Sequence, residues 1–484
     1  MTEINLDRLF NPESLAMIGA SDTPGKWGFI ILMNILKGGF RGRFYPVNPK
    51  RESILGVPCY PCIADVPGPV DAVLITTPAH LVSGLIDECG AKGVPYAVVV
   101  TSDFSEAGPE GARLEREIVA KAAGYGMRVI GPNTMGLFSS KPSLHALMPP
   151  VMPLRGSVSM FSQSGNVGVQ MLGWGINEGV GFEKFISSGN EGDLNCEDYL
   201  AYFAHDPDTR VILAYIEGVE LNSRLVPLAR RTSKEKPILV FKGGRTEIGR
   251  KAAASHSGSM AGSAAVYSSV FRQTGMVEAP SSQGLMDCAK AFAAYPIPKG
   301  YRVGILTRGG GWGVITADAC EENGLIIPKL PEAQTRILDG ILPKYWNRDN
   351  PVDMVAVISE QTYLDCLEVL AGWDGIDAVI ALQGSARTAD DFPETIRGTP
   401  ELMAAVKTIR AFLNAQNDRS DPIVECMAEL VRRTGKPFIG VNTCSAEEHR
   451  RSYLDYGVVS YPTPERAVRV LRLMADYGRF LGSA

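Results

Sequence analysis

One histidine among the five in this 484-residue chain stands in a stretch of small residues. His256 lies in RKAAASHSGSMAG, at residues 250–262, between Ser255 and Ser257 and next to Gly258. A neutral imidazole is a nucleophile, and its attack on phosphorus gives a phosphohistidine. Such a side chain needs open approach and donors for phosphoryl oxygens, which these small neighbours offer. Spacing alone leaves two interpretations, phosphoryl transfer through His256 or an ordinary loop histidine.

A phosphohistidine also needs a carboxylate that orients the ring and stabilises its positive charge. The segment YIEGVE, at residues 215–220, ends an apolar run and offers Glu217 or Glu220 for this role. Structural or solvent-exposed roles are the simplest explanation for the other four histidines, which are His80, His145, His205 and His449. His256 is therefore the candidate for chemistry.

Three glycine-containing turns follow apolar runs. They are GASDTPGKWG at residues 19–28, SQSG at 162–165 and RGGGWG at 308–313. A strand that enters a helix through small residues exposes unpaired backbone N–H groups and the positive end of the helix dipole, so it can bind an anion. The alternatives are a tight turn in the first case and a serine N-cap in the second. Close packing of helix on sheet is favoured for the third.

The first turn does not fit a nicotinamide dinucleotide site. Gly19, Gly25 and Gly28 are spaced differently from GxGxxG. The next apolar run, YPVNPK, ends in Lys50, where such enzymes carry an acidic residue. Lys50 instead supplies a point charge for phosphate, unless it is a solvated surface lysine. Ser21 either caps the following helix or binds phosphate. A dehydrogenase is therefore disfavoured.

Apolar, β-rich runs alternate with helical stretches along almost the whole chain, which predicts parallel, doubly wound α/β sheets. In the first series we expect strands at 14–20, 43–49, 71–78, 96–104 and 127–133, and helices at 26–40, 80–92 and 109–124. A second series has strands in SVSMFSQ, FEKFISSGN, RVILAYIEGV and PILVFKGG. A third has strands in RVGILTRGGGWG, AVIALQG and PFIGVN.

This alternation predicts three α/β domains. We expect the first domain at 1–140, the second at 150–296, the third at 300–460 and a C-terminal helix at 461–484. The segment 139–156 contains four prolines and is expected to be a linker.

Composition narrows the class of protein. The formal net charge of −5 weighs against a nucleic-acid partner, which usually meets a basic excess. The chain shows no signal peptide and no run of about 18 apolar residues, so no membrane association is expected. Nine dispersed cysteines are typical of reduced thiols in a cytoplasmic protein. Cys59 and Cys62 form a lone CxxC that we interpret as loop residues, and no metal site is expected.

The order of motifs resembles the NDP-forming acyl-CoA synthetase superfamily, in the α-type part related to the succinyl-CoA synthetase α subunit. The motifs are AMIGAS, YPVNP, ITTPA, GPNTMG, SQSG, YIEG, AAASHSGSMAG, NPVD and YPTPERA. ASHSG is the most specific, because it is similar to the family's phosphohistidine loop with Ser257 in place of threonine. The resemblance covers nearly the whole chain. It implies a Rossmann-like CoA-binding domain followed by two flavodoxin-like domains.

The resemblance also implies roles for individual residues. His256 would carry the phosphoryl group and Glu217 would hold its ring. The phosphate-binding residues would be Ser162, Ser164, Gly165, Ser257 and Gly258. The coenzyme A site would comprise Gly19, Ser21, Gly28, Lys50, Thr77, Pro78 and Asn133. Thr134 stands where many relatives have cysteine, and RGGGWG where many have an Asn-Ala-Gly-Gly pattern, so these positions depart from the family.

The implied reaction is carboxylate plus CoA plus ATP giving acyl-CoA, ADP and phosphate, through phosphohistidine and acyl-phosphate intermediates. Mg²⁺ would accompany ATP. The sequence has no Walker-type P-loop, and it ends at Ala484, about where fused relatives continue into an ATP-grasp region. We therefore expect a separate ATP-grasp β-type subunit and a hetero-oligomer. The alternative is a CoA-binding regulatory or scaffold protein without ligase activity. The acid itself is left open.

Overall fold

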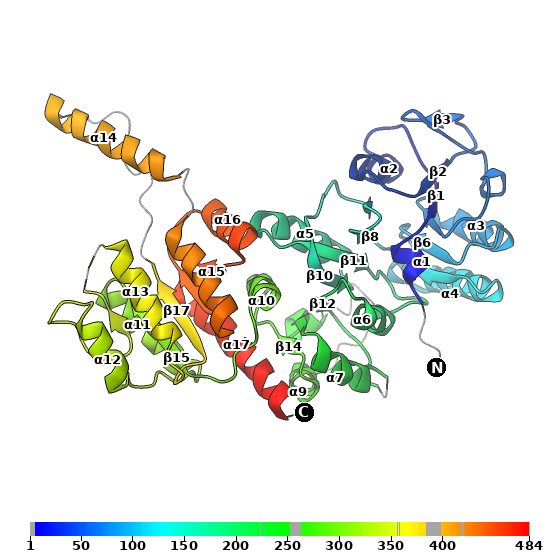
Figure 1. Cartoon of the computed structure of the whole chain (residues 1–484). Helices are drawn as coiled ribbons and strands as arrows, with labels where there is room; N and C mark the ends of the chain where they lie inside the picture. The colour runs from blue at the N-terminus through cyan, green and yellow to red at the C-terminus, as the bar shows by residue number, and fades with distance from the viewer. Residues whose placement is uncertain are drawn as a thin grey trace. The chain divides into compact units, whose positions relative to one another are not determined.

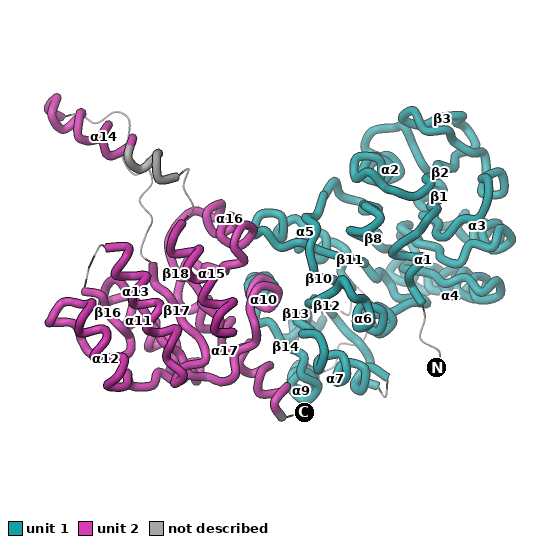
Figure 2. Tube along the Cα trace, viewed as in Figure 1, with its two compact units in different colours: residues 1–289 teal, residues 290–484 magenta. Residues whose placement is uncertain are grey.

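The computed structural model describes residues 5–222, 224–251, 263–355, 357, 359–383, 398–417 and 421–483. His256, Ser257 and Gly258 lie outside the described residues. The chain divides into two compact units, residues 1–289 and residues 290–484 (Figure 2). Among the described helices, none combines the length and the apolar character needed to cross a bilayer.

The first sheet of unit 1 has five parallel strands in the order β2-β1-β5-β6-β7. Figure 1 labels β1, β2 and β6 of this sheet. The strands are β1 (Ser14–Ile18), β2 (Arg43–Val47), β5 (Ala72–Ile75), β6 (Tyr96–Val99) and β7 (Arg128–Ile130). The main helices are α2 (Trp27–Gly38), α3 (Ala79–Ala91) and α4 (Pro109–Gly124). Smaller elements are α1 (Asp7–Phe10), β3 (Ser53–Ile54), β4 (Val57–Pro58), and 3₁₀ turns at Ile63–Asp65 and Ser105–Ala107.

Side chains of β1 point alternately to two apolar layers. Leu15 and Met17 pack in one buried cluster, whereas Ala16 and Ile18 pack in another. Because both faces of the strand are covered, all five of its residues are buried. This is the reason why a strand of a parallel sheet has a continuous apolar sequence rather than an alternating one.

The second sheet of unit 1 has seven strands in the order β14-β13-β12-β10-β11-β8-β9. Its parallel strands are β10 (Arg155–Ser162), β11 (Phe182–Ser187), β12 (Val211–Ile216), β13 (Ile238–Lys242) and β14 (Val277–Glu278). Antiparallel strands β8 (Gly136–Ser139) and β9 (Leu144–Leu147) extend one edge. Its helices are α5 (Gly165–Glu178), α6 (Cys196–His205), α7 (Leu225–Glu235), α9 (Ala264–Thr274) and α10 (Ser282–Ala294).

The expectation of a linker at 139–156 is wrong for the part that forms β9. This strand pairs with β8 and packs beside α2, where the Asn34 side-chain amide donates to the Leu147 and Pro149 carbonyls, both at 2.8 Å. His145 is buried so close to Gly38 that a Cβ there would lie 2.2 Å from the imidazole. The prolines flank β9 and do not interrupt its hydrogen bonds to β8. A segment with four prolines can therefore still contain a strand.

Unit 2 contains a third sheet of five parallel strands, in the order β16-β15-β17-β18-β19. The strands are β15 (Val303–Thr307), β16 (Val352–Asp353), β17 (Ala378–Leu382), β18 (Phe438–Val441) and β19 (Ser460–Tyr461). The helices are α11 (Gly310–Glu322), α12 (Glu332–Asp339), α13 (Glu360–Ala371), α14 (Pro400–Asn417), α15 (Pro422–Thr434), α16 (Ala446–Tyr456) and α17 (Pro464–Ser483). The C-terminal helix α17 contacts α11, β18 and β19.

All three sheets share one topology. When the parallel strands of each sheet are numbered in chain order, they lie side by side as 2-1-3-4-5. The doubly wound α/β fold predicted from the sequence is thus confirmed. In such a sheet the chain reverses its direction of winding beside the first strand, and ligands bind outside the carboxyl ends at this switch point. Each of the three glycine turns directly follows the first strand of its sheet, so each lies at a switch point.

Candidate functional site

The first glycine turn is closed by a contact between its two ends. Gly19 follows β1 with φ +92°, a left-handed conformation that favours glycine. Gly28, near the start of α2, lies so close that an added Cβ would be 2.1 Å from the Gly19 carbonyl oxygen. Both glycines are therefore required by geometry, because no larger residue fits between the turn and the helix.

Side chains from the loop after β2 hold this turn. Asn48 donates its side-chain amide to the Ala20 carbonyl at 2.8 Å and accepts from the Lys50 backbone N–H at 2.9 Å. The Ser21 hydroxyl accepts from the Thr23 N–H at 3.1 Å, so it stabilises the turn and does not cap α2. Lys50 is exposed at this edge. The placement leaves its charge available to a ligand at the switch point.

An ion pair that the sequence analysis missed crosses the same edge. The Arg51 guanidinium donates to the Asp22 carboxylate at 2.8 Å and joins the loop after β2 to the glycine turn. This hydrogen bond holds the pKa of Asp22 below its usual range. Only the pairing of β1 with β2 brings these side chains together, so no local sequence motif predicts the contact.

The loop after β5 forms the other wall of this switch point. The Thr76 hydroxyl donates to the Ile18 carbonyl at 3.2 Å, and a Cβ on Gly19 would lie 2.6 Å from that hydroxyl. In the described part of the chain, the Thr77 hydroxyl oxygen is buried without a hydrogen-bond partner. Pro78 is exposed at the N-cap of α3. An unsatisfied buried hydroxyl at a ligand edge is a candidate for a hydrogen bond to the ligand.

Asn133 lies where the first two sheets of unit 1 meet. The segment after β11 runs along the segment after β7: the Asn190 N–H donates to the Pro132 carbonyl at 2.9 Å and the Gly192 N–H to the Gly131 carbonyl at 3.0 Å. The Asn133 side-chain amide donates to the Asn190 side-chain oxygen at 3.2 Å. Asn133 therefore lies between the edge of the first sheet and the carboxyl edge of the second.

The Thr134 side chain bonds within the fold. Its hydroxyl is buried, donates to the Ser187 carbonyl at 2.5 Å and accepts from the Gly136 N–H at 3.0 Å. Both contacts stabilise the start of β8, which pairs with β11. The structure thus gives the Thr134 side chain a role in holding the start of β8.

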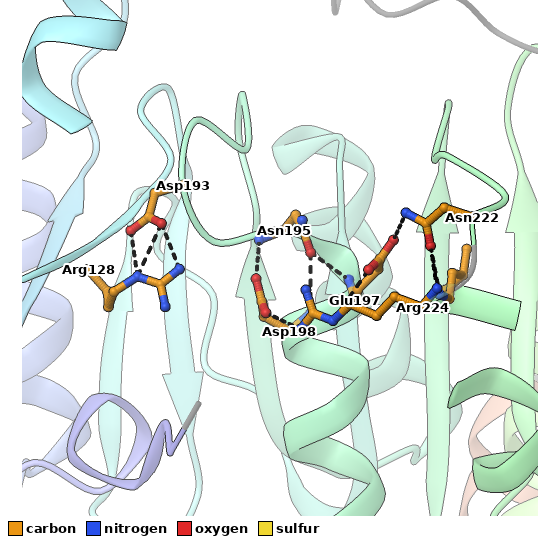
Figure 3. Close-up of polar contacts among 8 residues, drawn as sticks. Arg128, Asp193, Asn195, Glu197, Asp198, Asn222 and Arg224 are labelled. Carbon is orange, nitrogen blue, oxygen red and sulfur yellow. Dashed lines mark hydrogen bonds and ion pairs between the residues drawn. The ribbon is translucent and has the colours of Figure 1, made fainter. Parts of the chain in front are cut away.

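A cluster of charged and amide side chains supports the loops of the second sheet (Figure 3). Asp193 accepts from the Arg128 guanidinium, with a closest N–O distance of 2.6 Å, and from the Val129 N–H at 2.8 Å. Asn195 and Asp198 form a reciprocal capping box at the start of α6. This box satisfies backbone N–H groups that the helix leaves unpaired.

The same cluster anchors the loop that carries Glu217. Asn222 donates to Glu197 at 2.8 Å, and Arg224 contacts Glu197 at 3.5 Å and also Asp198 (Figure 3). Asn222 and Arg224 thus tie the chain beyond Glu217 to the start of α6. The anchor limits how far this loop can move away from the carboxyl edge of β12.

The second glycine turn places SQSG at the start of α5. The Ser164 hydroxyl accepts from the Val167 N–H at 3.4 Å, so Ser164 is the N-cap of the helix. The Ser162 hydroxyl is buried and donates to the Ser164 carbonyl at 2.6 Å. A Cβ on Gly165 would lie 2.3 Å from the Met135 side chain. The serine N-cap interpretation holds for Ser164, while the adjacent N–H groups retain the dipole's affinity for anions.

Glu217 lies at the same switch point as SQSG. It follows β12, which pairs directly with β10, and its backbone N–H donates to the Gln163 side-chain oxygen at 2.6 Å. Its side chain is buried and accepts from the Tyr215 hydroxyl at 3.3 Å. Burial, together with this carboxylate, raises the pKa of Tyr215 to about 12. Glu220, the alternative, is exposed.

Two residues of this site escaped the sequence analysis. Gln163 lies inside SQSG, but its side chain contacts the loop after β12, 54 positions along the chain. Lys242 ends β13, and its ammonium donates to the Glu217 carbonyl at 2.6 Å. A lysine at the end of the apolar run PILVFKGG was the only available signal.

The third turn supports close packing at two of its glycines. A Cβ on Gly313 would lie 3.0 Å from the Thr307 side chain, and one on Gly310 would lie 3.1 Å from the Asp353 carboxylate. Arg308 places its guanidinium 4.9 Å from the Tyr363 ring centroid. The described residues contain no cluster of three or more His, Cys, Asp or Glu side chains suited to a metal ion.

Comparison with known proteins gives consistent matches. Residues 13–139 match the family described as CoA binding domain, and residues 155–292 match the succinyl-CoA ligase like flavodoxin domain. The chain is 34% identical over 481 residues to the α subunit of an ADP-forming acetate–CoA ligase I from Pyrococcus furiosus, covering 99% of this chain and 98% of that one. It is 40% identical to an ADP-forming acetate–CoA ligase I from Archaeoglobus fulgidus, covering 98% of this chain and 64% of the relative.

Among solved structures, a similar chain is the dinucleotide-forming acetyl-coenzyme A synthetase 1 of Ca. Korarchaeum cryptofilum, in complex with phosphate and ADP. It superposes with a TM-score of 0.85 at 36% identity, covering 99% of this chain and 98% of that chain.

Proposed function

This chain belongs to the NDP-forming acyl-CoA synthetase superfamily, and we propose that it is the α-type subunit of an enzyme that converts a carboxylate, CoA and ATP into acyl-CoA, ADP and phosphate. The observation that carries the proposal is the meeting of Glu217 with the capped start of α5 at one switch point. A carboxylate and a helix N-terminus are the two groups that phosphohistidine chemistry needs, one for the ring and one for the phosphoryl oxygens.

The proposed sequence has three steps. His256 attacks the γ-phosphorus of ATP, a P–N bond forms and the P–O bond to ADP breaks. The substrate carboxylate then attacks this phosphorus, and the P–N bond breaks. The products are an acyl phosphate and a neutral histidine. The CoA thiolate attacks the acyl carbon, and the C–O bond breaks to release phosphate. Glu217 stabilises the charged ring, and Ser162, Ser164 and Gly165 face phosphate.

For CoA we propose the crevice of the first sheet. The contact between Gly19 and Gly28 forms a turn that a Cβ would fill, and the unsatisfied Thr77 hydroxyl lies on the opposite wall. Lys50 supplies positive charge for a phosphate group. Asn133 lies at the edge shared with the second sheet. The thiol of CoA is proposed to reach the acyl phosphate past this residue.

A β-type subunit with an ATP-grasp region is proposed to supply ATP and Mg²⁺, in a hetero-oligomer. Two relatives that match this chain over 98% and 82% of their own length are named α subunits, which supports this arrangement. All nine cysteines are free thiols, in keeping with the proposed cytoplasmic location. The proposed domain limits remain 1–140 for CoA, 150–296 for the phosphohistidine, 300–460 for the third domain and 461–484 for the terminal helix.

The labelling experiment tests the histidine. The chain and a β-type partner are incubated with γ-labelled ATP, and acid-labile label on this chain is measured. We expect label on the native protein and none on His256→Ala, whereas His205→Ala, a change at an exposed helix-end histidine, keeps it. Label that survives His256→Ala refutes the phosphohistidine. Absence of label from a chain that still binds CoA favours the scaffold alternative.

A second experiment tests the CoA crevice. Lys50→Ala is expected to weaken CoA binding about fivefold in calorimetry, because an exposed charge contributes up to about 1 kcal/mol. Lys37→Ala, at an exposed lysine near the end of α2, serves as the matched control and should bind normally. Equal affinity of the two variants contradicts the placement.

The acid is best identified by activity of the reconstituted complex. Relatives are named for acetate, for 4-hydroxybutyrate and for the trans-feruloyl group. We propose acetate as the first compound of the screen, followed by a hydroxy acid and an aryl acid. Turnover is measured as CoA-dependent release of phosphate.

A further inference from the structure

We propose that Gln163 and Lys242 are positioning residues that hold the backbone of Glu217 from both sides. We call this pair the Glu217 clamp. This proposal rests on the proposed function. The two side chains keep the Glu217 carboxylate in place for the phosphohistidine. Neither side chain is required to touch substrate.

The clamp begins where the sheet ladder ends. β12 lies between β10 and β13, and the last backbone bonds run from the Gln163 N–H to the Tyr215 carbonyl at 3.1 Å and from the Gly243 N–H to the Ile216 carbonyl at 2.8 Å. Glu217 directly follows β12 and has no ladder partner among these bonds. Its peptide groups are paired by side chains instead, one from each flanking strand.

On the β10 side, Gln163 uses its whole side-chain amide. The oxygen accepts from the Glu217 N–H at 2.6 Å and from the Gly218 N–H at 3.1 Å. The nitrogen donates to the Gly218 carbonyl at 2.8 Å and to the Glu191 carboxylate at 3.2 Å. A side-chain amide has two acceptor positions and two donor hydrogens, so these four contacts use its full hydrogen-bonding capacity. A rotated amide would point N–H groups at N–H groups, so the orientation is determined by the contacts.

On the β13 side, Lys242 holds the carbonyl. Its side chain is 1% exposed, and its ammonium donates to the Glu217 carbonyl at 2.6 Å and to the Gly243 carbonyl. The same ammonium lies 4.8 Å from the Tyr267 ring centroid. Burying a cation is costly, and an apolar side chain of equal length would fill the volume without that cost. A requirement for its hydrogen bonds explains the lysine.

The Glu217 side chain lies close to Gly243 and Tyr215. A Cβ on Gly243 would lie 2.6 Å from the Tyr215 hydroxyl and 3.5 Å from the Glu217 side chain. The glycine therefore admits both groups, and the Tyr215 hydroxyl donates to the carboxylate at 3.3 Å. Catalytic groups must be held within about 0.5 Å by their supporting residues, and a backbone clamp satisfies this need.

The test uses the full chain with its β-type partner and three single variants. Gln163→Met removes the four hydrogen bonds at similar length, and Lys242→Met does the same on the other side. Gln170→Met is the matched control, because Gln170 is an exposed residue of α5 whose side-chain amide donates to Asn166 of the same helix. Hydrogen exchange of the segment 215–220 and the rate of phosphohistidine formation are measured for each.

We expect exchange at Glu217 and Gly218 to quicken about tenfold in Gln163→Met, because each lost hydrogen bond changes the opening equilibrium by up to about that factor. Phosphohistidine formation should slow by about tenfold or more, with the affinity for CoA unchanged. A double variant separates positioning from general damage. In a Glu217→Gln background, Gln163→Met should have no further effect on the rate, since it acts through that carboxylate.

Unchanged exchange in both clamp variants overturns the clamp, whatever the activity. Faster exchange with normal phosphohistidine formation overturns its positioning role. A further loss of the phosphohistidine formation rate when Gln163→Met is added to Glu217→Gln overturns that role as well. Failure of the native protein to take up label is a separate result: it overturns the proposed function, and with it the role of the clamp, while the exchange data still report whether the contacts form.

Discussion

Replacement of Gly28 by alanine directly perturbs the first switch point. An added Cβ would lie 2.1 Å from the Gly19 carbonyl oxygen, whereas real Cβ contacts below 3.0 Å are essentially never found, so the two groups must separate by about 0.9 Å. Overpacking of this kind costs about 1–3 kcal/mol. Because the oxygen belongs to the backbone of the turn, no side-chain rotation relieves the contact.

Gly84→Ala provides the comparison. Gly84 lies inside α3, and among the described residues no atom outside the nearby helix backbone stands within 4 Å of an added Cβ. Alanine in a helix is favoured over glycine by about 0.5–1 kcal/mol, so this variant should gain stability. The two variants thus differ in the sign of the effect although the chemical change is identical.

The assay measures local free energies by native-state hydrogen exchange of β1 and α2, and CoA affinity by calorimetry. Gly28→Ala should lower the local free energy of opening by about 1–2 kcal/mol. It should also weaken CoA binding by about tenfold or more, since a shift near 1 Å misplaces the groups of the turn. If Gly28→Ala matches Gly84→Ala in both measurements, the close contact imposes no constraint and the reasoning is refuted.

Two further predictions concern buried charge in unit 1. Burial lowers the pKa of His145 to about 4. The unfolded chain, in which this pKa has its ordinary value near 6.5, therefore binds more protons than the folded chain. The free energy of unfolding should fall by up to about 3 kcal/mol as the pH falls from about 6.5 to 4. Urea unfolding across this range should show the loss in the native protein and not in His145→Phe. Lys184 is buried and pairs with Asp206 at 2.8 Å and Glu183 at 3.2 Å, so Lys184→Met should cost about 3–5 kcal/mol by leaving buried carboxylates unpaired. Arg113→Ala, at an exposed ion pair, should cost less than about 1 kcal/mol in the same titration.

Local sequence patterns predicted most of the fold. The apolar run at residues 14–20 predicted a strand of a parallel sheet, and the structure forms β1 at Ser14–Ile18 with all five residues buried. The helix expected at residues 26–40 forms as α2 (Trp27–Gly38), and Gly39 is its left-handed C-cap. The proline-rich segment 139–156 misled because β9 is defined by its pairing with the neighbouring β8 and by its contact with α2, where Asn34 bonds Leu147 across 113 positions of the sequence.

The candidate site was predicted in part. Glu217, Ser162 and Ser164 meet at one switch point, as a shared site requires. His256 lies outside the described residues, so its approach to Glu217 stays a prediction. Gln163 and Lys242 could not be assigned from sequence, because a glutamine in a turn and a lysine at a strand end are ordinary until the pairing of strands is known.

The sequence by itself determined the local elements: where apolar runs form buried strands, where glycines permit left-handed turns, and which helices begin beside hydroxyl or glycine residues. These features depend on conformational preferences and burial within a few neighbouring residues. The tertiary structure decided the strand order 2-1-3-4-5, which brings the ends of β10, β12 and β13 to one edge. Hydrogen bonds between residues 163, 217 and 242 exist only because the sheet pairs segments that are 25 to 54 positions apart.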